Sequence, residues 1–255
     1  MILAKKERYS HPLLILFGSL LLILSFPKFS CSFLAWIALV PFFKLIENHS
    51  SGKRFRLGYI FGLVYSLGVF YWVTHSMHYY GGLDPFTSFG VLVMMVAYLA
   101  LYTGAFAWAW GLIPPRGILS LFWAPSLWVI LEFLRAFLLT GFPWELLGYS
   151  QYNFPLVAQS AEWTGVYGVS FLIVLVNQAL YQIFLVKPSC HVSDMTPRRA
   201  KTGTEDSRPH FSIKEPEAVG KWKTAVLTLV MLGGTLVFGW QALDKQKMQD
   251  LKSLS

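Results

Sequence analysis

Two charged residues stand in an otherwise apolar run, and their spacing suits an electrostatic role. Glu132 and Arg135 are three residues apart in "LWVILEFLRAFLL" (127–139). On a helix this spacing puts both side chains on one face, where they can pair. Charges in a membrane helix face the bundle interior or reach the interface. Two interpretations stay open: a structural ion pair that fixes helix register, or a site for a lipid headgroup or an acidic substrate group.

The stretch that follows, "TGFPWELLGYSQ" (140–151), combines large aromatic rings with residues that turn the backbone. Scattered aromatics are typical of the belt at a membrane interface. Here two glycines and Pro143 force a bent backbone between Trp144 and Tyr149. A bent segment at membrane depth is tolerated when it packs on protein or lines a cavity. The pattern therefore favours a cleft wall, which also includes Phe142.

The histidines and cysteines give weaker signals. His75 and His78 end an apolar segment beside two tyrosines, and no third metal ligand is near them in sequence. This pattern is more typical of interfacial side chains than of a metal site. Cys31 and Cys190 are far apart and have no CxxC spacing. The sequence therefore predicts no metal site and no disulfide framework.

Composition indicates the class of protein that must position these residues. Hydrophobic residues make up 55% of the 255 residues, charged residues only 13%, and the mean hydropathy is +0.51. Soluble domains carry about 25% charged residues, and disordered chains are far less apolar. The chain is therefore predicted to be an all-α, polytopic membrane helix bundle.

Seven apolar segments are expected to be helical, of which five are long enough to cross a bilayer alone. The first two are short, so they either cross with the help of flanking residues or form a shallow hairpin. The seven segments are 13–26, 33–46, 57–76, 86–113, 118–139, 166–186 and 225–243.

The N-terminal "AKKER" before an apolar run also suggests a secretory signal, and Cys31 even suggests a lipoprotein signal. Lys28, however, stands where that signal needs an apolar residue, and the next apolar run starts at once. An uncleaved first helix is therefore the preferred interpretation.

Loop charges predict the orientation. With the N-terminus in the cytoplasm, 16 of the 21 lysines and arginines fall on the inner side and 5 on the outer side. The positive-inside rule then predicts N-in, C-out topology. The same bias accounts for the net charge of +8 without a nucleic-acid partner. Residues 75–84 and 140–151 are placed on the outer face.

Some polar and small residues have a simpler structural interpretation. Asn177 and Gln178 are predicted to form hydrogen bonds between helices. Gly58 and Gly62 form a GxxxG pattern, which is common in membrane helices and specifies no chemistry.

Several stretches, in order and spacing, resemble one bacterial family. They are "LSFPKFSCSFLAWIALVPFF" (24–43), "LGYIFGLVYSLGVFYWVTHSMHYYGG" (57–82), "LWVILEFLRAFLLTGFPWELLGYSQ" (127–151) and "GVYGVSFLIVLVN" (165–177). The chain resembles the membrane portion of apolipoprotein N-acyltransferase. Glu145 departs from the pattern, because an uncharged residue is expected after Trp144.

The resemblance implies an activity. Family members are inner-membrane enzymes that move an acyl chain from a phospholipid to the α-amino group of a lipoprotein's diacylglyceryl-cysteine. A Cys thiolate forms a thioester, a Glu acts as base, a Lys stabilises the oxyanion, and no cofactor is needed. The implied partners are phospholipid and diacylated lipoprotein. The implied location is the bacterial inner membrane.

The same resemblance sets an expectation about catalysis. The family's Glu, Lys and Cys belong to a nitrilase-like domain, and only Gln241 to Ser255 stand in its place here. A packed domain needs roughly 50 residues or more. None of the three catalytic residues can therefore be assigned to a position in this sequence. A fragment, a split gene with a separate nitrilase-like polypeptide, and a truncated remnant all stay open, as does a non-catalytic lipid-binding or transport protein.

The predicted organisation follows from these points. Residues 1–186 form the membrane bundle, 187–223 a flexible cytoplasmic loop, 224–243 the last transmembrane helix and 244–255 a periplasmic tail. The candidate residues of the substrate cleft are Glu132, Arg135, Phe142, Pro143, Trp144 and Tyr149.

Overall fold

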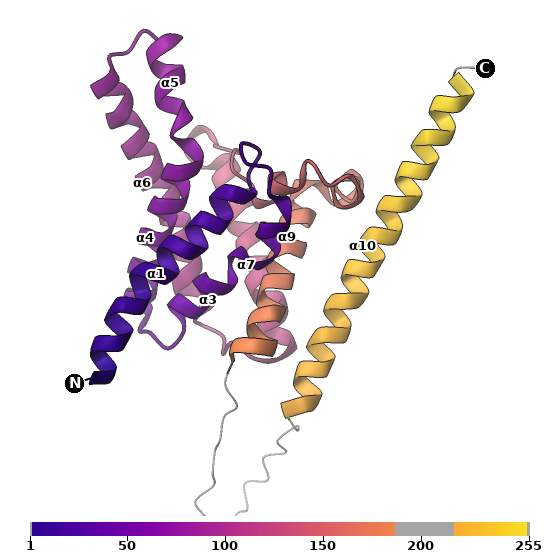
Figure 1. Ribbon diagram of the computed structural model, residues 1–255, viewed down its shortest axis with the longest axis horizontal. Helices are drawn as coiled ribbons and strands as arrows, with labels where there is room; N and C mark the ends of the chain where they lie inside the picture. Colours follow the sequence, from indigo (N-terminus) through magenta and orange to yellow (C-terminus); the bar gives the residue numbers. More distant parts are fainter. Residues whose placement is uncertain (1, 187–216, 254–255) are drawn as a thin grey trace, which may run out of the picture.

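The computed structural model describes residues 2–186 and 217–253, and all regular elements within these ranges are helices (Figure 1). They are α1 (Ile2–Ser25), η1 (Ser32–Leu34), α2 (Ala35–Ala38), α3 (Val40–Ile46), α4 (Ser51–Phe70), α5 (Trp72–Tyr79), α6 (Pro85–Trp110), α7 (Gly117–Phe137), η2 (Leu138–Thr140), η3 (Leu147–Gln151), α8 (Pro155–Ala158), α9 (Ala161–Leu180), η4 (Tyr181–Leu185) and α10 (Glu217–Ser253). The predicted all-α class is confirmed, and each of the seven apolar segments lies in a helical region.

The structure shows fewer clear membrane crossings than the expected seven. Within the described residues, four helical stretches are long and apolar enough to cross a membrane: α6, α7, α9 continued by η4, and the 220–245 part of α10. The pair α4 and α5, bent by 49°, makes up to five. The first two apolar segments form shorter apolar helices, and the second is broken into η1, α2 and α3. A count of seven spans is therefore not established.

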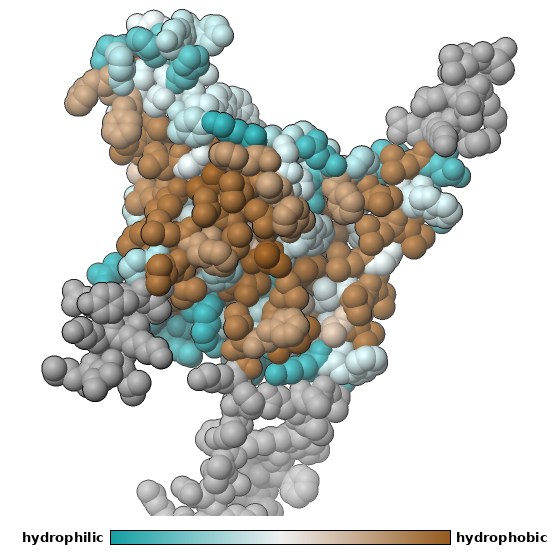
Figure 2. Space-filling model, viewed as in Figure 1, coloured by the Kyte–Doolittle hydropathy of each residue, from teal (hydrophilic) through white to brown (hydrophobic). Residues whose placement is uncertain are grey.

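Surface hydropathy fits a protein embedded in a bilayer. Figure 2 shows a broad hydrophobic surface across the middle of the bundle, with hydrophilic residues over the tip of α5 and α6 and at the opposite end. The end of the bundle that carries α5 also carries the turn after α1 and the C-terminal end of α10 (Figure 1). We call it the α5 end.

Small residues let α4 and α6 pack closely. A Cβ atom added at Gly58 would lie 2.4 Å from the Ala107 Cβ, and one at Gly62 would lie 2.8 Å from the Thr103 Oγ1. Side chains larger than glycine at these positions would push the helices apart. The GxxxG pattern is therefore a packing motif, as the sequence indicates.

Two buried amides of α9 bind neighbouring elements. Asn177 binds the broken second segment, and Gln178 binds α6 and α7. Asn177 Oδ1 accepts from the Leu39 backbone N–H at 2.8 Å, and Asn177 Nδ2 donates to the Ala35 carbonyl at 2.9 Å. Gln178 accepts from the Trp110 indole at 3.2 Å and donates to Ser120 at 3.0 Å. The predicted interhelical role of both amides is confirmed. Asn177 binds backbone groups at the break between α2 and α3, where the helix's own bonds are interrupted.

Helix α10 lies at the edge of the bundle and packs along α7, α8 and α9. It begins at Glu217 and ends at Ser253, so it extends past both predicted bounds, 224 and 243. Cys190 and most of the predicted 187–223 loop lie outside the described residues.

Candidate functional site at the α5 end

The segment 141–152 connects α7 to α8 through a tightly bent backbone. Gly141 has a φ of +82°, and a Cβ atom there would lie 2.2 Å from the Ala136 carbonyl oxygen. Gly148 lies so close to α9 that a Cβ atom would be 2.5 Å from the Val166 carbonyl oxygen, and its N–H donates to Ser170. Both positions require glycine. The segment is thus held against the bundle, as the turn-forming residues indicate.

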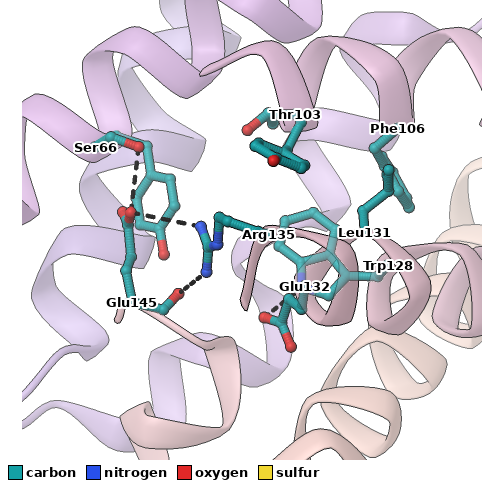
Figure 3. Close-up of a pocket in the computed structure, with 10 residues that line it drawn as sticks. Ser66, Thr103, Phe106, Trp128, Leu131, Glu132, Arg135 and Glu145 are labelled. Carbon is teal, nitrogen blue, oxygen red and sulfur yellow. Dashed lines mark hydrogen bonds and ion pairs between the residues drawn. The ribbon is translucent and has the colours of Figure 1, made fainter. Parts of the chain in front are cut away.

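Arg135, in the last turn of α7, holds the first half of this segment. Its Nη2 donates to the carbonyls of Trp144 at 2.9 Å and Glu145 at 3.1 Å. Its Nη1 lies 3.9 Å from Glu145 Oε2, and both side chains are buried (Figure 3). The guanidinium therefore stabilises the bent backbone through two carbonyls and one carboxyl group.

Glu132, one turn earlier, holds the second half. Its Oε1 accepts from the Trp128 indole at 2.9 Å and from the Leu147 backbone N–H at 2.7 Å. The salt bridge of Arg135 is to Glu145, so the pair that the spacing favours does not form as expected. Both charged residues of α7 instead bind the backbone of segment 141–152.

Glu145 is the residue that the sequence interpretation missed. Its side chain is fully buried, its backbone has a φ of +62°, and its Oε2 accepts from Ser66 of α4 at 3.3 Å. Burial raises the pKa of the Glu145 carboxyl to about 8, while the nearby Arg135 guanidinium and the Tyr65 and Ser66 hydroxyls act in the opposite direction. The signal available in the sequence was a charged residue after Trp144, where an uncharged residue is expected.

A small polar cavity lies between these groups. It is lined by residues of α4, α6 and α7 and by Glu145, and its volume of about 30 Å³ is enough to hold ordered water. Three buried atoms of its lining residues have no hydrogen-bond partner among the described residues: Glu132 Oε2, Arg135 Nε and Glu145 Oε1. We call these three side chains the buried charge cluster. The cavity is too small for an acyl chain.

A larger, apolar groove opens beside the same segment. Its walls come from residues 23–29 at the end of α1, residues 68–72 at the junction of α4 and α5, and Trp144, Tyr149 and Tyr152. We call it the α1–α4 groove. Its volume is about 420 Å³, within the range of sites for small molecules.

Aromatic contacts form the groove's edge. The Trp144 ring stacks on Trp72 with centroids 5.8 Å apart, and Phe142 packs against Trp144 at 5.5 Å and Phe70 at 5.3 Å. Trp144 and Tyr149 remain 51% and 43% exposed, enough to contact a bound molecule.

The six candidate residues thus occupy different positions. Trp144 and Tyr149 line the groove, Phe142 supports Trp144, and Pro143 is exposed at the bend. Glu132 and Arg135 lie beneath, in the buried charge cluster. Trp72 and Tyr152 also line the groove and were not singled out in the sequence.

His75 and His78 make local contacts near the end of α5. His78 donates from Nδ1 to the Leu83 carbonyl at 2.7 Å, which stabilises the turn between α5 and α6. His75 packs against Tyr79 within α5.

Comparison with known proteins gives a consistent match. Residues 18–179 match the family described as "Apolipoprotein N-acyltransferase N-terminal domain". A protein of Geobacter metallireducens named apolipoprotein N-acyltransferase is 40% identical over 231 residues, which cover 91% of this chain and 40% of the relative. A protein of the same name from Methylococcus capsulatus is 37% identical over 68% of this chain and 35% of the relative. One from Pasteurella multocida is 32% identical over 72% of this chain and 35% of the relative. The chain thus spans less than half the length of these curated relatives.

Proposed function

Because the chain belongs to the apolipoprotein N-acyltransferase family through its N-terminal domain, we propose that it is the membrane module of such an enzyme. In this role it binds phospholipid and the lipid anchor of a diacylated lipoprotein in the bacterial inner membrane. It presents the ester and amine ends of these molecules to a nitrilase-like catalytic domain on the outer side. That domain is either part of a longer form of this protein or a separate polypeptide.

The observation that carries this proposal is the α1–α4 groove beside the segment 141–152. The groove is apolar, lies at one end of a membrane bundle and is edged by Trp144 and Tyr149. Acyl chains need an apolar surface, and the reacting ester needs to stand near water at the bundle's end. The buried charge cluster fixes the segment that carries both aromatic residues.

The loop charges support the orientation. Among the described residues, Lys44, Lys53, Arg54 and Arg56 lie in or before the start of α4, opposite the α5 end, and Arg116 precedes α7 at the same side. The α5 end is then periplasmic by the positive-inside rule.

A chimera tests the function. In the complete Geobacter metallireducens relative, the 231 aligned residues are replaced by those of this chain, and N-acylation of a diacylated lipopeptide is followed by mass spectrometry. We expect transfer by the chimera and none by the 255-residue polypeptide alone. An inactive chimera that is folded and membrane-inserted would contradict the proposal. Robust transfer by the 255 residues alone would contradict the assignment of chemistry to a nitrilase-like domain.

A further inference from the structure

We propose that the α1–α4 groove holds one acyl chain of a glycerophospholipid, with its phosphate bound by the Lys28 ammonium. This inference deepens the proposed function and rests on it for the choice of a lipid as occupant. It adds a residue that determines which lipids are selected.

The groove has the shape for a single chain that enters from the α5 end. Phe26 and Phe70 are buried at 6% and 2% exposure, and Gly68 brings α4 close to Ile23 of α1. These residues make an apolar floor. Tyr152, whose hydroxyl lies 2.7 Å from Ser30 Oγ, closes one edge of the groove.

Lys28 supplies positive charge where a headgroup would lie. It is exposed in the turn after α1 and lines the groove, and its Nζ lies 4.1 Å from the centroid of the Tyr71 ring. The salt bridges Lys44–Glu47 and Arg135–Glu145 do not involve Lys28, which has no carboxylate partner among the described residues. The Tyr71 ring covers one side of the ammonium, and the N–H groups on its other side remain available for an anion.

The other charge at the groove does not compete for this cation. Glu145 is also a lining residue of the groove, but its side chain is fully buried and points toward Arg135 and Ser66. The accessible charge at the groove is therefore positive, and it complements a phosphate.

In a bilayer, the contact between Lys28 and the phosphate determines which lipid the groove selects. Lipid tails are as apolar as the groove walls, so moving an acyl chain from the bilayer into the groove gains little free energy. The groove selects the shape of a chain, and Lys28 distinguishes a phospholipid from an uncharged lipid. A lysine that only snorkels to the interface would make no such distinction.

Native mass spectrometry of the full chain in detergent can test the site. The delipidated protein is titrated with phosphatidylethanolamine, or with diacylglycerol of the same acyl chains, which lacks the phosphate. We expect the phospholipid to bind roughly five- to tenfold more tightly, the effect of one charge-assisted contact near the surface. Lys28→Gln should remove this preference and leave diacylglycerol binding unchanged. Lys53→Gln, at the opposite end of the bundle, is the matched control.

A second pair of variants tests the chain-binding part. Val69→Trp narrows the groove and should weaken both lipids, whereas Ile60→Trp, on an exposed face of the same helix, should weaken neither. Thermal unfolding shows that each variant is folded. Inorganic phosphate at millimolar concentration should not displace the phospholipid, because it lacks the chain; displacement would assign Lys28 to a free-anion site and overturn the proposal. Unchanged phospholipid preference in Lys28→Gln would also overturn it.

The two proposals fail separately. If the chimera transfers acyl groups while Lys28→Gln binds phospholipid normally, the family function stands and the Lys28 site does not. If the chimera is folded but inactive while phospholipid preference depends on Lys28, the lipid site stands without the enzyme role.

Discussion

Two buried polar networks hold this bundle together, and they differ in how completely their atoms are paired. The network around Asn177 and Gln178 in α9 pairs both amide groups with neighbouring helices. The buried charge cluster leaves one polar atom unpaired on each of Glu132, Arg135 and Glu145. The first contains neutral amides only, whereas the second contains three ionisable side chains beside a cavity.

The difference indicates what each network is for. Fully satisfied neutral networks specify helix positions at little electrostatic cost. Charged groups with unpaired buried atoms are costly to maintain and are typical of functional regions. The cluster supports the segment that carries Trp144, so these energetically unfavourable buried groups lie beside the edge of the proposed lipid groove. Four variants, ordered by expected loss of stability, can break or sharpen this comparison.

Arg135→Met should have the largest effect. It removes the cation that binds the carbonyls of Trp144 and Glu145 and leaves buried carboxyl groups without a positive partner. We expect a loss of about 3 kcal/mol or more in unfolding free energy. Thermal and denaturant unfolding in detergent measures it, with Arg56→Met, on the exposed face of α4, as control. Equal stability of the two variants would show that the cluster contributes no more than a surface charge.

Asn177→Leu should cost about 1–3 kcal/mol. The leucine has nearly the same size but leaves the Leu39 N–H and the Ala35 carbonyl unpaired at the break between α2 and α3. The same unfolding assay applies, and hydrogen exchange at the break should increase. A cost greater than that of Arg135→Met would reverse the ranking of the two networks.

These two variants also separate what the sequence predicts from what it does not. An amide in an apolar helix has few options, so the interhelical role of Asn177 follows from residue type alone. The partner of Arg135 does not. Its spacing favours Glu132 on the same helix, but the left-handed backbone at Glu145 turns that carboxyl back under the segment 141–152. Such a backbone reversal depends on tertiary packing and leaves no periodic pattern in the sequence.

The groove shows the same limit. The aromatic residues and turns of 140–151 predict a shaped wall, and the opposite walls come from residues 23–29 and 68–72. Their meeting depends on how α1 packs against α4. The helices themselves were predictable, because long apolar runs in a bilayer have no other way to pair their backbone groups.

Glu145→Gln should change stability by less than about 1 kcal/mol near pH 4, where the carboxyl is protonated in both the folded and unfolded states, because glutamine matches the size and neutrality of a protonated glutamate. The variant should have a clearer effect on how the free energy of unfolding depends on pH. The carboxyl has a folded-state pKa of about 8 and an unfolded pKa near 4.3. Its protonation stabilises the fold below the unfolded value, and this stabilisation is lost as pH rises toward the folded value. The wild type should thus become less stable between about pH 5 and 8, and the variant should show a flatter profile. Parallel profiles would mean that Glu145 is ionised with Arg135 throughout.

Trp144→Ala should have the smallest effect on stability, below about 1 kcal/mol, since half of the ring is exposed and its ring contacts are with Trp72 and Phe142. In the chimera, however, it should reduce acyl transfer by about tenfold, because it removes the edge of the groove while the cluster still holds the backbone. Trp163→Ala is the matched control, since Trp163 is 79% exposed and packs against Phe238, away from the groove. Equal transfer by both variants would assign Trp144 to the interfacial aromatic belt. A selective loss would show that the segment held by the buried charge cluster carries a surface used in the reaction.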